Sequence, residues 1–292
     1  PYQRVYYDSL SPLPQNITTD SDGNWIASYG LQPNQHLTIT AVGQAHLVAK
    51  PSYPPAIPSE VEGPAMTQAT TYWPTADPAI QKLSKSLTTP WSIYNYIVNA
   101  LQYDYTLVKT GSPRKGGAAA LNTPDSSLCT EFTDAFITLA RAAGIPAREI
   151  NGYGYTTDSR LRPLGTASNV LHAWPQYWDA ASKNWINIDP TWGKTTGGID
   201  YFNKFDFSHF AFVTHGQSDS IPYPPSKATV ELESYRDYPP TLPKVTWVAP
   251  WQVYPFVSTP SQLLVQNTSG QAQYSLSLSI SPSHFTLSSP GS

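Results

Sequence analysis

The residue of this chain with the most distinctive chemistry is Cys129, the only cysteine among 292 residues. Phe132 and Phe136 follow it at helical spacing, so we expect a helix that begins at the cysteine and ends at Gly144. At a helix start, unpaired N–H groups and the positive end of the helix dipole stabilise a thiolate over a thiol. The same N–H groups can hold an oxyanion. The alternative is a small buried side chain, because free cysteines are among the most buried residue types.

Two further side chains have the types and positions that would activate a thiol. His172 interrupts an apolar strand, where a phenylalanine or leucine would pack better, and Asp189 stands at a strand end 17 residues later. A nucleophile at a helix start, with a base and an orienting carboxylate on adjacent strands, is the arrangement of a catalytic triad. Each has a simpler interpretation: a core histidine with one backbone hydrogen bond, and an aspartate that forms an Asx turn before proline.

Helices followed by strands must position these three residues. Asp77-Pro78 and Thr89-Pro90 each combine an N-cap residue with proline at the first helical position. We therefore expect a helix after each pair, before the one at Cys129, and a loop over residues 111–124. Strand-like patterns follow over residues 148–156, 170–178, 185–188 and 207–213. This order predicts an α+β domain with an antiparallel sheet.

The regions that flank this domain have β-type patterns. A turn is indicated at Asp22-Gly23-Asn24, and alternation predicts strands over residues 37–40 and 274–280. Proline-rich stretches are typical of stiff connectors between domains. We therefore expect four parts: a β-domain over residues 1–58, the α+β domain over 59–215, a linker over 216–243 and a β-sandwich-like domain over 244–292, which we expect to be truncated because it ends soon after its last strand.

Five short motifs occur in order through the α+β region: Cys129-Thr130-Glu131-Phe132, Leu139-Ala140-Arg141-Ala142-Ala143-Gly144-Ile145-Pro146-Ala147-Arg148, Gly152-Tyr153, His172-Ala173-Trp174 and Asp189-Pro190-Thr191-Trp192. Together they resemble the core of the transglutaminase-like superfamily, of the microbial type, over residues 65–215. The resemblance implies a papain-like α+β core flanked by small β-domains. It also implies that Cys129 is the nucleophile, His172 the base and Asp189 the group that orients the base.

The chain departs from the family pattern at three positions. Leu128 stands where many relatives carry glycine directly before the nucleophile, and Gln176 stands where glutamate is common. No motif matches the oxyanion-stabilising tryptophan of the animal enzymes. Trp91 is a candidate, but its place in the first turn of a helix favours core packing. The sequence also lacks a calcium loop of alternating Asp and Asn residues.

Aromatic and histidine side chains around the expected triad have two interpretations. Tyr153, Trp174 and Trp192 are candidates to line a groove for a peptide-like substrate, and they would equally fill the core of the sheet. His209 and His215, six residues apart, are candidate metal ligands, but no partner motif accompanies them. Packing is the favoured interpretation of both histidines, so we expect no metal.

Two charged side chains near the motifs have structural interpretations. We expect Glu131 to point away from the thiolate, whose charge it would oppose, and to act as a first-turn helix charge. The turn at Pro146 places Arg148 in the first strand of the sheet. We expect it to pair with a buried carboxylate such as Glu131 or Glu149, or to face solvent.

Composition and net charge limit the classes of partner that we expect for this chain. The formal net charge is −3 and no basic run occurs, which argues against a nucleic-acid partner. No stretch approaches the roughly 20 apolar residues of a membrane span. Charged residues make up only 13% of the chain. The surface must therefore consist largely of uncharged polar residues such as Ser, Thr and Tyr. A surface of this kind favours an extracellular or cell-surface location. No feature calls for a cofactor.

These observations favour a thiol acyl-transfer enzyme with a protein or peptide substrate. Cys129 would attack a glutamine-like amide, ammonia would leave with a proton from His172, and a lysine amine or water would resolve the thioester. A cysteine protease or amidase would use the same triad for hydrolysis. A non-catalytic extracellular binding module is the alternative from another class, against which the joint presence of Cys129, His172 and Asp189 argues.

Overall fold

The computed structural model describes residues 2–48, 50, 65–155, 169–205, 207–225, 229, 244–248 and 262–266. Contacts divide the chain into two compact units. The first comprises Pro1–Arg4, Ser11–Ile39 and Ala45–Tyr235, and the second comprises Val5–Leu10, Thr40–Gln44 and Arg236–Ser292. The expected domain boundary after residue 58 lies outside the described residues, so the four expected parts stay predictions.

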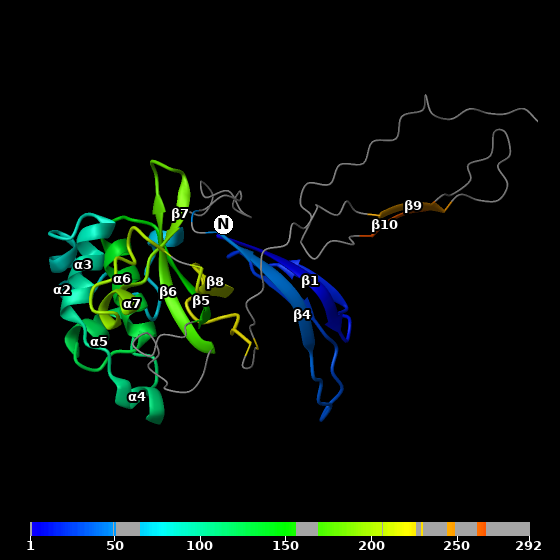
Figure 1. Cartoon of the computed structure of the whole chain (residues 1–292), viewed down its shortest axis with the longest axis horizontal. Coiled ribbons are helices and arrows are strands. Elements are labelled where there is room, and N and C mark those ends of the chain that lie inside the picture. Colours follow the sequence, from blue (N-terminus) through cyan, green and yellow to red (C-terminus); the bar gives the residue numbers. More distant parts are fainter. Residues whose placement is uncertain are drawn as a thin grey trace, which may run out of the picture. The chain divides into compact units, whose positions relative to one another are not determined.

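The first unit contains the helices, which gather on one side of a sheet (Figure 1). Their bounds are η1 (Ala65–Thr67, a 3-10 turn), α2 (Pro78–Ser84), α3 (Pro90–Ala100), α4 (Tyr105–Thr110), α5 (Gly117–Asn122), α6 (Cys129–Ala142) and α7 (Pro190–Thr195). The expected N-caps are present: the Asp77 carboxylate accepts from Ala79 N–H at 2.8 Å, and Thr89 forms a capping box with Ser92. Gly144, with φ of 78°, follows the end of α6 as predicted.

The prediction of a loop over residues 111–124 is wrong in part, because this segment contains the helix α5. Gly117 begins this helix for a packing reason. A Cβ at this position would lie 2.1 Å from Thr138 Oγ1 and 2.4 Å from the Asp134 carbonyl oxygen, both on α6. The glycine therefore allows α5 to approach the backbone of α6 closely.

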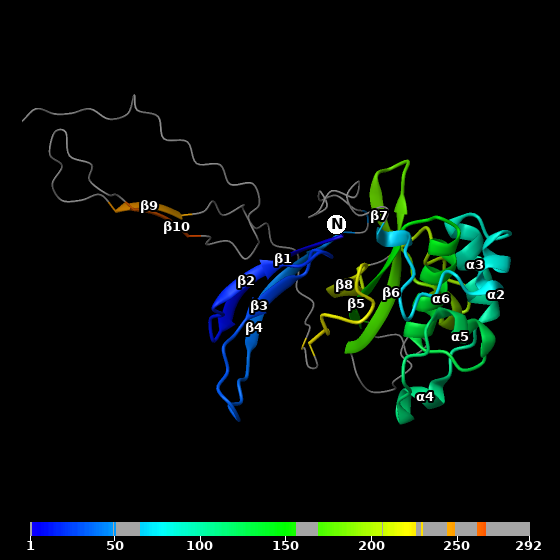
Figure 2. The same cartoon turned by 180° about the vertical axis from the view of Figure 1, so that it is seen from behind.

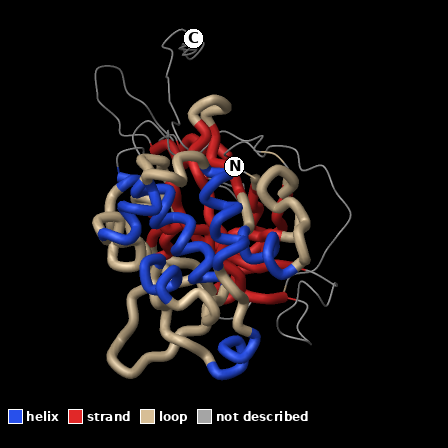
Figure 3. The backbone as a smooth tube through the Cα atoms, turned by 90° about the vertical axis from the view of Figure 1, so that its left-hand side faces the viewer, coloured by secondary structure: helices blue, strands red, loops and turns tan. Residues whose placement is uncertain are grey.

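The sheet of the first unit has four antiparallel strands in the order β7-β6-β5-β8. Their bounds are β5 (Ala147–Tyr155), β6 (Asn169–Asp179), β7 (Asn184–Asn187) and β8 (His209–His215). The helices cover one face of this sheet (Figures 2 and 3). The predicted α+β class with an antiparallel sheet is confirmed.

The core of this unit surrounds α6, whose side chains from Glu131 to Arg141 are all buried. Phe132, Phe136 and Leu139 pack with Ile93 and Ile97 of α3 and with other apolar side chains of the helices. Burial of a phenylalanine or leucine stabilises the fold by about 1.5–3 kcal/mol each. The helix that begins at Cys129 is therefore packed into the core over most of its length.

A hairpin from the N-terminal region joins the same unit. Strands β2 (Asn16–Thr19) and β3 (Trp25–Ser28) pair antiparallel around the predicted turn at residues 22–24. The Asp22 carboxylate accepts from the backbone N–H groups of Gly216 and Gln217 at 3.0 and 2.8 Å. Asn24 exchanges hydrogen bonds with the backbone of Thr214. The turn thus holds the end of β8.

The remaining strands form two-stranded sheets: β1 (Gln3–Ser11) with β4 (Thr40–Leu47), and β9 (Lys244–Val248) with β10 (Gln262–Gln266). The strand expected over residues 37–40 is misplaced, because only Thr40 is in β4. The strand expected over 274–280 lies outside the described residues. None of the described helices has the length and apolar character to cross a membrane.

Candidate active site

Cys129 is the first residue of α6 and is partly exposed. The turn before it is fixed by a parallel bridge between Tyr103 and Ser127 and by the Asp104 N–H, which donates to the Ser127 carbonyl at 2.9 Å. Glu131 completes a capping box, since its Oε2 accepts from the Leu128 N–H at 2.9 Å. Glu131 is therefore a first-turn helix charge, as expected, and it is buried against the backbone.

His172 lies on β6 and is 5% exposed. Its Nε2 lies 2.8 Å from Asp189 Oδ2. A carboxylate can only accept, so the imidazole carries a proton on Nε2 and its Nδ1 remains for the thiol. Burial lowers the pKa of His172, but the charge and hydrogen bond of Asp189 and a hydrogen bond with Cys129 raise it to about 10. The structure thus brings together the three residues that the sequence singled out.

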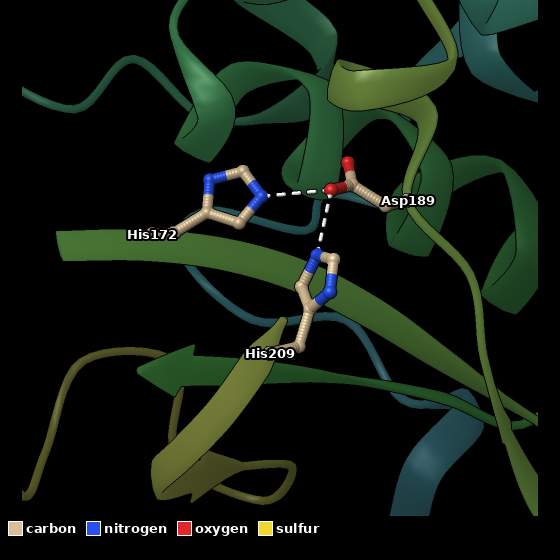
Figure 4. A group of neighbouring side chains, drawn as sticks. All are labelled: His172, Asp189 and His209. Carbon is tan, nitrogen blue, oxygen red and sulfur yellow. Dashed lines mark hydrogen bonds and ion pairs between the residues drawn. The ribbon is translucent and has the colours of Figure 1, made fainter. Parts of the chain in front are cut away.

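Asp189 is fully buried and caps α7. Its Oδ1 accepts from the Trp192 N–H at 2.9 Å, and its Oδ2 accepts from both His172 and His209, the latter at 3.0 Å (Figure 4). Burial raises the pKa of this carboxyl, but the two imidazoles outweigh burial and lower it below its ordinary value. The Asp189 carboxylate is therefore held by three donors.

His209 is the member of this cluster that the sequence interpretation missed, since we expected a packing role. The three side chains offer ligand atoms within 4.8 Å of one another, the spacing of a potential metal site. Here the Nε2 atoms of both imidazoles are engaged in hydrogen bonds with Asp189 Oδ2 (Figure 4). The expectation of no metal stays a prediction. His215, the other candidate, pairs instead with Glu149 Oε2 at 2.8 Å and with the Pro222 carbonyl.

Two tryptophans hold the His172 ring. Trp192 stacks on it with centroids 5.2 Å apart, and Trp174 does so at 5.9 Å. Both are buried, with exposed fractions of 4% and 1%, and Tyr153 is 8% exposed and packs edge-on against Phe212. Trp174 and Trp192 thus pack against the imidazole ring and restrict its movement. A substrate-binding role of these three residues remains a prediction.

The remaining candidates lie around this centre. Gln176 donates to Asn187 Oδ1 at 2.8 Å and accepts from Arg148 Nε at 2.8 Å. Arg148 also lies over the Trp185 ring at 4.1 Å. The prediction that Trp91 packs in the core is wrong, because this side chain is 49% exposed. It stacks on Tyr94 and contacts Phe202 edge-on.

Gly154 of β5 lets Trp192 approach the sheet. A Cβ at this position would lie 2.6 Å from Trp192 Cζ2 and 3.6 Å from the His172 Cβ. We expect Gly154→Ala to cost about 1–3 kcal/mol of stability, because the packed ring must move, and to reduce any activity that needs His172. Urea unfolding measures the loss. Gly30→Ala is the control, since this glycine is exposed and a Cβ there would meet only the flexible side chain of Gln15. Equal losses in both variants would contradict this role of Gly154.

The His172–Asp189 pair predicts a pH dependence of stability. The raised pKa of His172 means that its contribution is complete below about 6.5 and is lost as the pH rises towards 10. The lowered pKa of Asp189 means that its contribution is present above 3.8 and is lost below that value. We expect the difference in unfolding free energy between the wild type and His172→Gln to shrink by on the order of 3 kcal/mol over the alkaline window. Urea unfolding at several pH values checks this, and a constant difference would contradict it.

Comparisons with known proteins agree with the motifs. A family model described as the transglutaminase-like superfamily matches residues 75–190. Over 94 residues the chain is 33% identical to a protein-glutamine gamma-glutamyltransferase of Pseudomonas aeruginosa, a match that covers 31% of the chain and 14% of that protein. The chain therefore matches only a small part of the length of this relative.

Solved structures also resemble the chain. A Cytophaga hutchinsonii protein, provisionally named a cysteine protease, has 17% sequence identity and a TM-score of 0.46, covering 75% of this chain and 74% of that one. The periplasmic domain of TgpA from Pseudomonas aeruginosa has 20% identity and a TM-score of 0.39, covering 68% and 66%. The family match spans Cys129, His172 and Asp189. Over residues 75–190 the chain is therefore similar to the transglutaminase-like superfamily.

Proposed function

We propose that this chain is a thiol acyl-transfer enzyme of the transglutaminase type, with Cys129, His172 and Asp189 as its catalytic triad. The observation that carries the proposal is the 2.8 Å hydrogen bond between His172 Nε2 and Asp189 Oδ2, with the Cys129 thiol at the start of α6 close enough to His172 to raise its pKa. Such an arrangement moves a proton between a nucleophile and a leaving group. The curated relative, a glutamyltransferase, supports the same reaction class.

The first half-reaction follows from this geometry. The Cys129 sulfur attacks the carboxamide carbon of a glutamine side chain, and the C–N bond breaks as the His172 imidazolium gives its proton to the departing ammonia. Backbone N–H groups in the first turn of α6 face the developing oxyanion. The product is a thioester on Cys129, with His172 neutral.

The second half-reaction uses His172 as a base. A lysine amine of a protein substrate attacks the thioester, His172 takes the proton from the amine nitrogen, and the Cys129 thiolate leaves. An isopeptide bond results, and water in place of the amine would give glutamate. We propose a protein partner outside the cytoplasm, in keeping with the charge-poor composition.

The test incubates the full chain with casein and a fluorescent primary amine, followed by gel electrophoresis and an ammonia assay. Cys129→Ala is the matched control. We expect fluorescent casein and larger products from the wild type and neither from the variant. Casein fragments that depend on Cys129 would instead show a cysteine protease, and ammonia without amine incorporation would show a deamidase.

A binding module would give none of these products. Cys129 of such a module would also react with iodoacetamide at the rate of a free thiol, and His172→Ala would leave that rate unchanged. Fast labelling that His172→Ala abolishes would exclude this alternative.

A further inference from the structure

Asp189 Oδ2 has an unusual feature for the orienting group of a triad, since two imidazoles share it. His172 Nε2 lies 2.8 Å away and His209 Nε2 lies 3.0 Å away (Figure 4). Because the carboxylate only accepts, His209 also donates its Nε2 proton. The second histidine therefore bonds to the same oxygen that faces the base.

The surroundings of His209 would suit an apolar ring. Its side chain is fully buried. The neighbouring rings are aromatic, with centroid distances of 4.2 Å to Phe205, 4.4 Å to Trp192 and 4.9 Å to Trp174. Placing a polar imidazole here is unfavourable unless its N–H groups are satisfied. Packing alone thus leaves the choice of histidine unexplained, while the bond to Asp189 accounts for it.

The sheet brings the two histidines to one side of Asp189. On β5, Gly152 is paired with His172 of β6 and Gly154 is paired with His209 of β8. Gly154 has no side chain to separate the two rings, and a Cβ there would meet Trp192. Two strands that flank β5 can therefore direct their imidazoles to one carboxylate.

We propose that His209 is a positioning residue for acyl transfer, whose Nε2–H fixes Asp189 Oδ2 towards His172 and helps to keep that carboxylate ionised. The proposal rests on the proposed function of the triad. The Trp192 N–H holds Oδ1 and His209 holds Oδ2, so the carboxylate plane cannot rotate away from His172. The bond from His209 also helps to lower the pKa of Asp189 against burial.

Other titratable groups face this centre. Tyr94 of α3 directs its hydroxyl to the Asp189 carbonyl oxygen at 3.5 Å, and Tyr103 lies close enough to Cys129, Asp189 and Glu131 to sense their charges. Burial first, and then nearby negative charges, of which both tyrosines share that of Asp189, raise the pKa of Tyr94 and of Tyr103 above 10. Both phenols stay neutral between about pH 5 and pH 9. Changes of the Cys129 labelling rate in that range therefore do not come from these two phenols.

The test is the rate of Cys129 alkylation by iodoacetamide between about pH 5 and pH 9, a range that brackets the free thiol and imidazole pKa values. It is measured on the full chain for the wild type, His209→Phe and His209→Gln. Phenylalanine fits the aromatic surroundings but cannot donate. Glutamine keeps an N–H donor near the position of imidazole Nε2. Thermal unfolding of each variant reports on folding.

We expect His209→Phe to label about tenfold more slowly near pH 6, the typical effect of losing a hydrogen bond to a charged group. The low-pH limb of the plot of its labelling rate against pH should move to higher pH by about one unit, because a less well oriented carboxylate stabilises the imidazolium less. His209→Gln should restore most of the rate. His215→Gln, which removes a second buried histidine of β8 that bonds to Glu149, should leave the low-pH limb unchanged.

A His209→Phe profile identical to that of the wild type would overturn the proposal. An equal loss of labelling rate in His209→Phe and His209→Gln would also overturn it, since this would indicate that His209 has a packing role only. These results differ from a failure of the proposed function. In that case the wild type itself would label with the profile of a free thiol.

Discussion

Asp189→Asn is expected to lower amine incorporation into casein by about 10⁴-fold, the effect of this change in a well-studied triad. The variant retains an oxygen for the α7 cap and nearly the same volume, but it loses the charge. Burial would then act on His172 without an opposing anion, and its pKa would fall from about 10. The imidazolium that supports a thiolate and protonates the departing ammonia would be lost. Steady-state rates measured at neutral pH check this expectation.

The geometry of Asp189 sharpens the prediction. If the asparagine oxygen keeps the 2.9 Å bond from the Trp192 N–H, its NH₂ group faces the two imidazole Nε2 atoms. Donor then meets donor, and both rings must change tautomer or turn. Asp200→Asn is the matched control, because that carboxylate accepts only from its own turn among the described contacts. A rate for Asp189→Asn within tenfold of the Asp200→Asn rate would contradict a role for Asp189 in orienting the base.

The three residues of the proposed triad could be singled out from the sequence because each lies at a locally marked position. Cys129 opens an amphipathic helix, His172 interrupts an apolar strand, and Asp189 precedes a proline at a strand end. The contacts within each element depend on residues a few positions apart. The motif order then indicated that these elements meet, and the structure brings the three side chains together.

The contact of His209 could not be predicted in the same way. It depends on β8 pairing with β5 rather than with another strand, and on a register that shifts between Asn151 and Gly152. A shift of one residue in a strand turns every side chain to the other face. No local pattern around His209 encodes that register, so its aromatic neighbours alone favoured a packing role.

Trp91 shows a different limit of local patterns. Ile93 and Ile97 define the buried face of α3, and Trp91 lies two residues before Ile93. At about 100° per residue it points to nearly the opposite side of the helix. Its place in the first turn of the helix favoured core packing, while the helical phase requires the surface position that the structure shows. Gly117 similarly indicated a loop, although it serves the close approach of α5 to α6.

Arg114→Met is expected to destabilise the chain by about 3–5 kcal/mol, the usual result of removing one partner of a buried ion pair. Arg114 donates from Nε to Asp134 Oδ2 at 2.8 Å and from a terminal nitrogen to Glu149 Oε1 at 3.1 Å. Both carboxylates are fully buried. Methionine would fill the space of the arginine stem and leave the Asp134 carboxylate in the core without a cation, while among the described contacts Glu149 would keep only its bond with His215. Urea unfolding measures the loss.

The loss should grow with pH. Burial raises the pKa of Asp134 to about 7 even against the bonds from Arg114, and removing that cation favours the protonated carboxyl further. Below that value the variant can neutralise Asp134, whereas at higher pH it must bury the charge, so the folded state is penalised more. Lys82→Met, which removes an exposed cation of α2, should change stability by no more than about 0.5 kcal/mol. If Arg114→Met cost no more than Lys82→Met, or if its cost fell as the pH rose, Arg114 would not be the counterion that these buried carboxylates require.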